Sequence, residues 1–130
     1  MYNFFNRLTL FIKPVIWLAF IGVLCLMPLE DLPQISIVDH IYFDKGVHFM
    51  MYFILAVLLA KPVRKLRLPV WPVILLTTVL IGGLIEILQF AVTNYRSASW
   101  FDFFADMAGA AAGLLAFNML VADKWLERYV

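Results

Sequence analysis

Cysteine and charged residues are both scarce in this chain, and each scarcity excludes a class of protein. Cys25 is the only cysteine, so no disulfide can form within the chain and no pair of thiols can hold a metal. Only 15% of the 130 residues are charged, and the net charge is +1. The basic residues sit at the ends of apolar runs and form no nucleic-acid-binding surface. No nucleic-acid partner is therefore expected.

The motifs of common catalytic and cofactor sites are missing as well. The sequence has no glycine-rich phosphate loop, no G-x-S-x-G, no H-E-x-x-H and no internal repeat. Its two histidines and scattered acidic residues do not form a zinc-binding motif. The sequence therefore predicts no bound metal and no cofactor.

Apolar residues dominate the composition instead. They make up 65% of the chain, and the mean hydropathy is +0.93. A soluble domain of this size could not bury so much apolar surface, because small domains have a high ratio of surface to volume. Long apolar runs with charges at their ends are typical of membrane-spanning helices. We therefore predict an all-α protein, with a single transmembrane domain over residues 1–130.

Four apolar runs predict an integral membrane four-helix bundle. The expected helices cover about residues 8–29, 43–61, 69–94 and 100–122. The first run lacks an A-x-A-like cleavage site, so we interpret it as an uncleaved helix. Between the first two helices, Ser36 and Asp39 fit a capping box, which predicts a short helical segment in the membrane interface.

The distribution of lysine and arginine predicts the orientation of the bundle. Arg7 and Lys13 precede the first helix, and four basic residues lie between the second and third helices, over 61–67. The connection at 30–45 has one lysine against four carboxylates. By the positive-inside rule, both termini and the basic loop are cytoplasmic, and the other two connections face outwards. The protein is thus predicted to be multi-pass.

In this topology the polar residues of three helices gather at the outer face of the membrane. Glu86, for example, lies about 27 Å along the third helix from Leu68, at 1.5 Å per residue. The gathered residues are Asp44, Lys45, His48 and Tyr52, then Glu86 and Gln89, then Arg96 and Ser99 in the outer hairpin, and finally Asp102 and Asp106. Such convergence predicts a binding or catalytic site.

Most of these residues also have a structural explanation. Asp44 and Asp102 suit the N-terminal turns of helices. His48, Tyr52 and Gln89 suit hydrogen bonds between helices. The sequence leaves these structural roles open beside a role in a site.

Glu86 and Asp106 are the strongest functional candidates. Each lies among apolar residues, with no basic residue within one helical turn. Such a carboxylate must find a partner on another helix or be protonated, and ionisable residues inside membrane segments commonly mark functional sites. Arg96 is an available ion-pair partner for either residue, so a structural ion pair remains a competing interpretation.

Small residues in the last two helices predict close packing of their backbones. Gly109 and Gly113 form the strip GAAAG, and Gly82 and Gly83 lie one turn before Glu86. The strip suits packing within the monomer or the seam of a homo-oligomer, and we favour packing within the monomer.

Three motifs together resemble the VanZ-like family of small bacterial membrane proteins. They are D-K-x2-H-x3-Y over 44–52, E-x2-Q over 86–89 and R-x2-S-x2-D-x3-D-x2-G-x3-G over 96–113. They occur in the order and spacing of the family, over roughly two thirds of the chain. The resemblance implies that the polar residues of these motifs, with Gly109 and Gly113, are the family's shared positions. The family often has asparagine where this chain has Asp106.

The resemblance also implies a place in the bacterial cytoplasmic membrane and a link to the cell envelope. The founding member, VanZ, is associated with low-level resistance to the glycopeptide teicoplanin. Some members are labelled phosphotransbutyrylase, but nothing in this sequence resembles an acyl-phosphate or coenzyme A site.

Three functions follow as hypotheses, with membrane lipids as the expected partners. The first is binding of a lipid headgroup or a lipid-linked envelope precursor through Arg96 and Lys45. The second is an enzyme acting on such a lipid, with Glu86 or His48 as general base and Asp106 as acid. The third is a proton-linked oligomeric carrier that uses the two buried carboxylates. We favour the first, because no nucleophile is identifiable.

Overall fold

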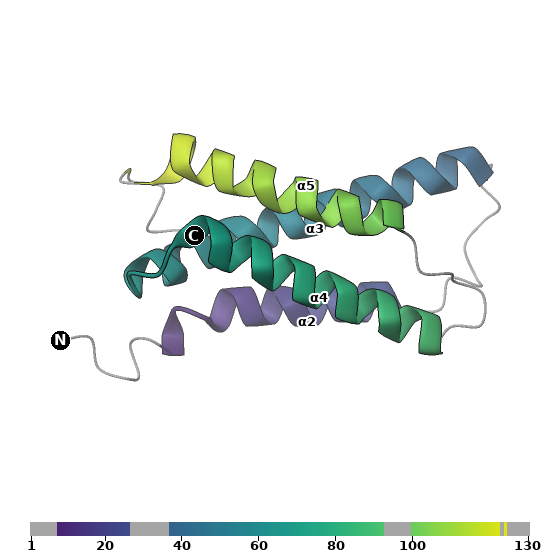
Figure 1. Ribbon diagram of the computed structural model, residues 1–130, viewed down its shortest axis with the longest axis horizontal. Coiled ribbons are helices and arrows are strands. Elements are labelled where there is room, and N and C mark those ends of the chain that lie inside the picture. The colour runs from purple at the N-terminus through teal and green to yellow at the C-terminus, as the bar shows by residue number, and fades with distance from the viewer. Residues whose placement is uncertain (1–7, 27–36, 93–99, 123, 125–130) are drawn as a thin grey trace.

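Helices account for all the regular structure in the part of the chain that the computed structural model describes, which is residues 8–26, 37–92, 100–122 and 124. The elements are α2 (Ile12–Leu26), α3 (Ile37–Lys65), α4 (Val70–Val92), α5 (Trp100–Ala116) and a π-helical turn, η1 (Phe117–Val121), that continues α5 (Figure 1). The prediction of an all-α fold is confirmed.

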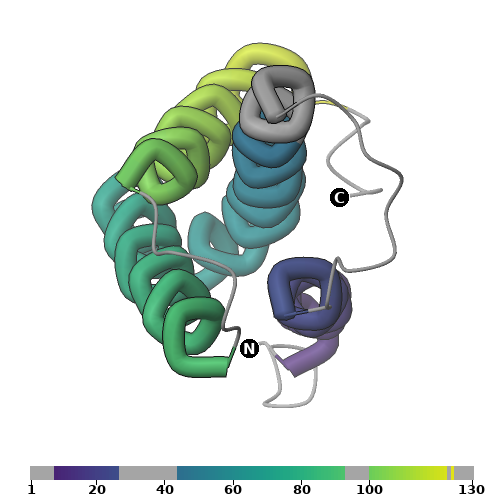
Figure 2. Tube along the Cα trace, turned by 90° about the vertical axis from the view of Figure 1, so that its right-hand side faces the viewer, coloured from purple at the N-terminus to yellow at the C-terminus, as the bar shows by residue number. Residues whose placement is uncertain are grey.

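The four α-helices lie side by side and alternate in direction. In Figure 1, α2 and α4 run from left to right, and α3 and α5 run back. The end view in Figure 2 shows α3, α4 and α5 grouped together, and α2 packs against α3 and α4. This alternation brings the first turns of α3 and α5 to the same end of the bundle as the last turns of α2 and α4.

Three segments are long and apolar enough to cross a membrane, by their length and composition. They are Asp44–Lys65 of α3, Val70–Val92, and Trp100–Val121, which combines α5 and η1. α2 has 15 residues, so it is roughly 22 Å long at 1.5 Å per residue. Residues 27–29 of the helix predicted over 8–29 lie outside the described residues. The chain is a membrane protein, and its orientation stays a prediction.

α3 is longer at both ends than the helix predicted over 43–61. At its start it includes residues 37–42, part of the connection in which we expected a short interfacial segment. At its other end it passes through Pro62 and continues for a further turn. A proline removes one hydrogen bond from the helix without always ending it, because neighbouring helices hold the backbone in place in membrane proteins.

The C-terminal end of α3 is set by its backbone conformation. The amide of Leu68 donates a hydrogen bond to the carbonyl oxygen of Val63 at 3.2 Å, and Arg67 has a φ of 59°. Both features belong to the Schellman cap, in which glycine usually occupies the left-handed position. Pro69 follows at once, and α4 begins after it.

α3 and α5 approach each other closely along a seam lined by glycine. A Cβ atom added to Gly109 would collide with the carbonyl oxygen of Phe49, and one added to Gly113 would collide with that of Phe53. The GAAAG strip therefore packs within the monomer, backbone against backbone.

Two apolar clusters fill the rest of the interior. One joins α3, α4 and α5, and its buried members are Ala56, Ala60, Val63, Ile74, Ala110, Leu114 and Phe117. The other joins α2 to the bundle through Ile21, Cys25, Met51, Tyr52, Leu55 and Ile85. The indole nitrogen of Trp17 also donates a hydrogen bond to the carbonyl oxygen of Met51 at 2.9 Å.

Candidate functional site

Buried polar residues gather at one end of the bundle, which we call the polar end. It is the end where α3 and α5 begin and where α2 and α4 finish. Five side chains of ionisable or amide type are at most 8% exposed there, namely His48, Glu86, Gln89, Asp102 and Asp106. They come from three helices that are far apart in the sequence. Burying them is costly, so each needs a physical explanation.

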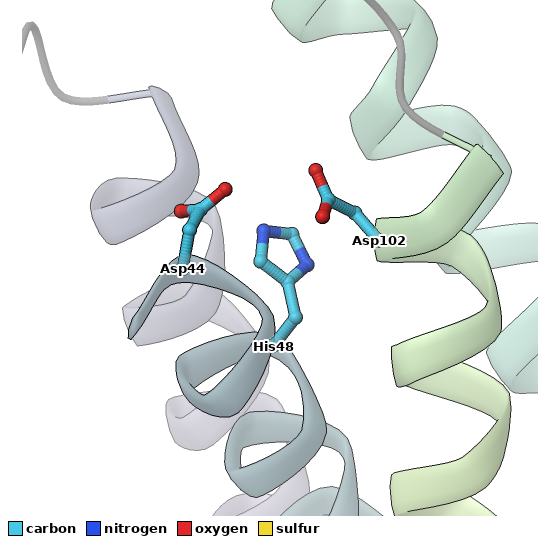
Figure 3. Close-up of side chains that lie close together, drawn as sticks. All are labelled: Asp44, His48 and Asp102. Atoms are coloured by element: carbon cyan, nitrogen blue, oxygen red, sulfur yellow. The ribbon is translucent and has the colours of Figure 1, made fainter. Parts of the chain in front are cut away.

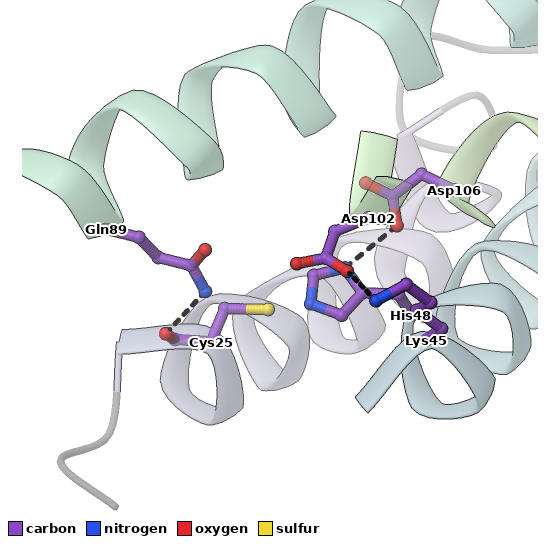
Figure 4. Close-up of polar contacts among 6 residues, drawn as sticks. All are labelled: Cys25, Lys45, His48, Gln89, Asp102 and Asp106. Carbon is purple, nitrogen blue, oxygen red and sulfur yellow. Dashed lines mark hydrogen bonds and ion pairs between the residues drawn. The ribbon is translucent and has the colours of Figure 1, made fainter. Parts of the chain in front are cut away.

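His48 and Asp106 form the central pair of the polar end. Nδ1 of His48 lies 3.0 Å from Oδ1 of Asp106, and the two side chains are 4% and 2% exposed (Figure 4). An ionised carboxylate can only accept a hydrogen bond, so Nδ1 is then the donor. In a neutral imidazole, this places the hydrogen on Nδ1 and the lone pair on Nε2. The pair thus orients an imidazole whose other nitrogen is available for chemistry.

Gly82 makes room for Asp106 on the α4 side. A Cβ atom at Gly82 would lie 3.0 Å from Oδ2 of Asp106 and 3.5 Å from the hydroxyl oxygen of Tyr52. That hydroxyl is buried and forms no hydrogen bond with any group in the described part of the chain. The three residues therefore lie close together where α3, α4 and α5 meet.

Lys45 and Asp102 form the outer part of the polar end. Nζ of Lys45 lies 3.8 Å from Oδ1 of Asp102, and the lysine side chain is 30% exposed against 12% for the aspartate. The same ammonium lies 5.6 Å from the centre of the Phe101 ring, within the range of a cation–π interaction. Lys45 therefore presents a positive charge at the rim of the buried cluster.

A second grouping of side chains shares His48. One ligand-type atom each from Asp44, His48 and Asp102 lie within 4.8 Å of one another. Figure 3 shows the imidazole between the two carboxylates, with the edge that is remote from Cβ turned towards the space between them. The sequence predicted no metal site. It placed these three residues at the same end of the bundle, but it did not indicate that they group as possible metal ligands.

Gln89 connects two helices. Its Nε2 donates a hydrogen bond to the backbone carbonyl oxygen of Cys25, at 2.8 Å, and so attaches the last turn of α2 to α4 (Figure 4). Sequence reasoning offered two roles for Gln89, and this contact is the structural one. The thiol of Cys25 is buried in the apolar cluster.

Glu86 is buried one turn after Gly82, on the side of α4 that faces the bundle. It lies close enough to Asp106 for their charges to interact, and Asp102 does as well. Several carboxylates thus share a small volume with His48 and Lys45. Such an arrangement of like charges favours the binding of a cation or of protons.

Other predicted site residues are not brought into this geometry. Arg96 and Ser99 lie outside the described residues. A Cβ atom at Gly83 would meet no described atom within 4 Å, so Gly83 makes no close helix contact there. Sequence reasoning also missed Phe101, which touches Lys45 only because α3 and α5 pack side by side.

The family model VanZ/LLP1 matches residues 2–121. Comparisons with curated proteins and with solved structures gave no match.

Proposed function

Because the chain belongs to the VanZ/LLP1 family and has helices that can cross a membrane, we propose that its polar end binds the anionic headgroup of a lipid or of a lipid-linked envelope precursor. The observation that carries this proposal is the position of Lys45. Its ammonium lies at the rim of the buried cluster, partly exposed, above the ring of Phe101. A headgroup can reach this charge without entering the helix bundle.

The outer face of α5 gives such a lipid a place for its acyl chains. Trp100, Phe101 and Phe104 are 77%, 71% and 64% exposed, and they surround the turn that carries Asp102. In a bilayer these rings contact hydrocarbon. A lipid lying along this face would bring its phosphate to the level of Lys45, where an ammonium is a suitable partner.

The charge pattern of the chain supports an extracytoplasmic position for this site. The basic loop at 61–69 lies at the opposite end of the bundle, where the positive-inside rule expects the cytoplasm. A site facing outwards can meet precursors of the cell envelope. This is the connection through which we propose a link to tolerance of glycopeptides such as teicoplanin.

Native mass spectrometry of the purified protein tests headgroup binding. We expect anionic lipid to co-purify with the wild type, and Lys45→Gln to lose most of it. Lys65→Gln is the matched control, because Lys65 is an exposed lysine at the other end of the same helix. Arg96→Ala tests the second cation that the sequence suggests. Absence of anionic lipid from the wild type, or equal loss in both lysine variants, would contradict the proposal.

The His48–Asp106 pair favours one alternative, an enzyme that acts on a lipid-linked substrate. A carboxylate that holds an imidazole in one tautomer is a common way to prepare a general base. In that case, His48→Gln would fold and still bind lipid, but would no longer convert it. The measurement is chromatography of an envelope lipid extract after incubation with each protein. Identical product profiles with the wild type, with His48→Gln and with no protein would exclude catalysis on those lipids.

A further inference from the structure

Asp44, His48 and Asp102 are arranged as a metal-binding site, and we infer that they bind a divalent transition-metal ion of the Zn²⁺ or Mn²⁺ type. Two of the residues come from the first turns of the α3 span and one from the first turn of α5. Asp44 and His48 are four residues apart, so their side chains point to the same side of α3. Asp102 faces them from the neighbouring helix (Figure 3).

The distances between the ligand-type atoms are close to those of an occupied metal site. The three ligand-type atoms lie within 4.8 Å of one another. Oxygen and nitrogen ligands bind zinc at about 2.0–2.2 Å, which places neighbouring ligand atoms about 3–4 Å apart. A change in side-chain torsion of the two aspartates can make up the difference.

His48 is held as metal-bound histidines usually are. In such sites the ring nitrogen that does not touch the metal donates its hydrogen to a carboxylate or a carbonyl group. Asp106 takes this part at 3.0 Å from Nδ1, with both side chains almost fully buried. The opposite nitrogen, Nε2, is thereby left as the ligand atom. This arrangement is independent of the distances within the three-residue cluster.

Asp102 supplies a second observation that points to a cation. The residue is only 8% exposed, and its Oδ1 atom is buried without a hydrogen bond from any described group. Lys45 lies 3.8 Å away from this atom, beyond the distance of a hydrogen bond. A buried carboxylate oxygen normally has a closer partner, and a metal ion would provide one.

The charges around the cluster favour an ion of charge +2. Asp106 interacts electrostatically with His48, Asp102 and Glu86, so several carboxylates share this region with His48 and the rim ammonium of Lys45. Their mutual repulsion is strong in a medium of low dielectric constant. A divalent cation would reduce it and stabilise the first turns of α3 and α5 against each other.

The ligand set selects the class of ion. Calcium and magnesium prefer sites made of oxygen ligands alone, whereas imidazole with carboxylate suits zinc and manganese. Three protein ligands leave at least one position open. A phosphate oxygen could occupy that position. The metal ion would then connect the acidic cluster to an anionic headgroup. This last extension rests on the proposed headgroup binding, but the metal site does not.

The test is a metal titration of the full chain in an uncharged maltoside detergent, free of added lipid. After treatment with a chelator and gel filtration, Mn²⁺ is added and the free ion is followed by electron paramagnetic resonance; Zn²⁺ is then added as competitor. We expect saturation at a single ion per chain, with displacement by Zn²⁺. No saturable binding of either ion to the wild type would overturn the inference.

Variants separate a metal site from a structural ion cluster. Asp102→Asn and His48→Gln should weaken binding by about 100-fold or more, and Asp106→Asn, which acts through His48, by about 10- to 100-fold. Lys45→Gln should strengthen binding, because it removes a competing cation. Thr78→Val is the control. Thr78 is buried in α4 further from the polar end, so this substitution should leave metal binding unchanged. Asp44→Asn provides a further ligand test at a half-buried position, in case the other variants fold poorly.

The outcomes for the metal and for the lipid can be told apart. If all ligand variants bind metal like the wild type, or if Lys45→Gln binds it more weakly, the metal site is excluded. Loss of lipid in Lys45→Gln would then still support headgroup binding. Conversely, metal binding by a protein that carries no anionic lipid would leave the metal site intact and contradict the proposed function.

Discussion

The seam between α3 and α5 has two halves with the same backbone contact but with different side chains lining them. In both halves a glycine of α5 lies against a backbone carbonyl of α3, Gly109 against Phe49 and Gly113 against Phe53. Beyond Gly113 the seam is lined by small and branched apolar residues such as Ala60 and Leu114. Before Gly109, towards the polar end, it is lined by charged residues and histidine.

The comparison indicates what each half contributes. In the apolar half, the two helices associate through close backbone approach and apolar packing. The polar half instead buries charged groups, which is costly in a membrane. We therefore propose that the charged residues of the polar end serve binding or chemistry, while the glycines and apolar residues hold the helices together.

The largest effect on stability is expected from a change at the glycine–carbonyl contact, which both halves of the seam share. Gly109→Val places a side chain against the carbonyl of Phe49, where backbone and not a flexible side chain must yield, so we expect a loss of about 3 kcal/mol in the free energy of unfolding. The measurement is unfolding in a mixed detergent system. Ala108→Val, on the exposed side of the same turn, is the control and should change little. Equal stability of the two variants would disprove the close contact.

A smaller loss is expected from breaking the polar half alone. Asp106→Leu leaves Nδ1 of His48 buried without its partner, which should cost about 2 kcal/mol of stability. Asp106→Asn keeps an acceptor for Nδ1 and should cost clearly less. Adding His48→Leu to Asp106→Leu should recover part of the loss, because the stranded donor is removed. If the double variant is as unstable as the sum of the single ones, the pair is not coupled.

Gly82 and Gly83, two adjacent glycines of α4, allow a substitution near the polar residues to be compared with one away from them. Gly82→Ala adds a Cβ atom 3.0 Å from Oδ2 of Asp106, so we expect Asp106 to shift and the free energy of unfolding to fall by about 1 kcal/mol. The shift should also weaken binding at the polar end. Gly83→Ala has no described atom within 4 Å and should be neutral or slightly stabilising. The same unfolding assay compares the two variants, and equal losses would contradict this assignment.

The smallest effect is expected at the end of α3 furthest from the polar end. Arg67→Gly relieves a left-handed conformation that glycine adopts easily, so we expect a gain of about 0.5 kcal/mol. Lys65→Gly removes the same charge from a helical position and should instead lose about 0.5–1 kcal/mol. Ligand binding at the polar end should not respond to either change. Stabilisation by both substitutions would show that charge, and not backbone conformation, is responsible.

The sequence predicted the helical class well, because composition and the length of apolar runs are enough to identify membrane helices. It did not predict how far α3 extends, since the pattern around Pro62 resembles a helix end and the interfacial segment before residue 44 has mixed polarity. Helix ends depend on backbone hydrogen bonds, such as the one from Leu68 to Val63, that leave little trace in composition.

For the candidate site, the sequence indicated the residues but not their pairing. Convergence of Asp44, His48, Glu86, Asp102 and Asp106 follows from alternating helices, but the choice of partner depends on the rotation of each helix. The sequence offered Arg96, which lies outside the described residues, as a partner for Glu86 or Asp106. The structure brings His48 to Asp106. The grouping of Asp44 with His48 and Asp102 depends on the same rotation.

The glycine seam fixes the register of the two helices. A sliding movement of α5 along α3 would bring alanine side chains onto carbonyls that only glycine can accept, so one setting is strongly preferred. His48 directly precedes Phe49, and Asp106 lies three residues before Gly109. The main-chain contacts of the glycine seam therefore set the distance between His48 and Asp106. A relative with asparagine at this position would keep the same geometry while changing its charge.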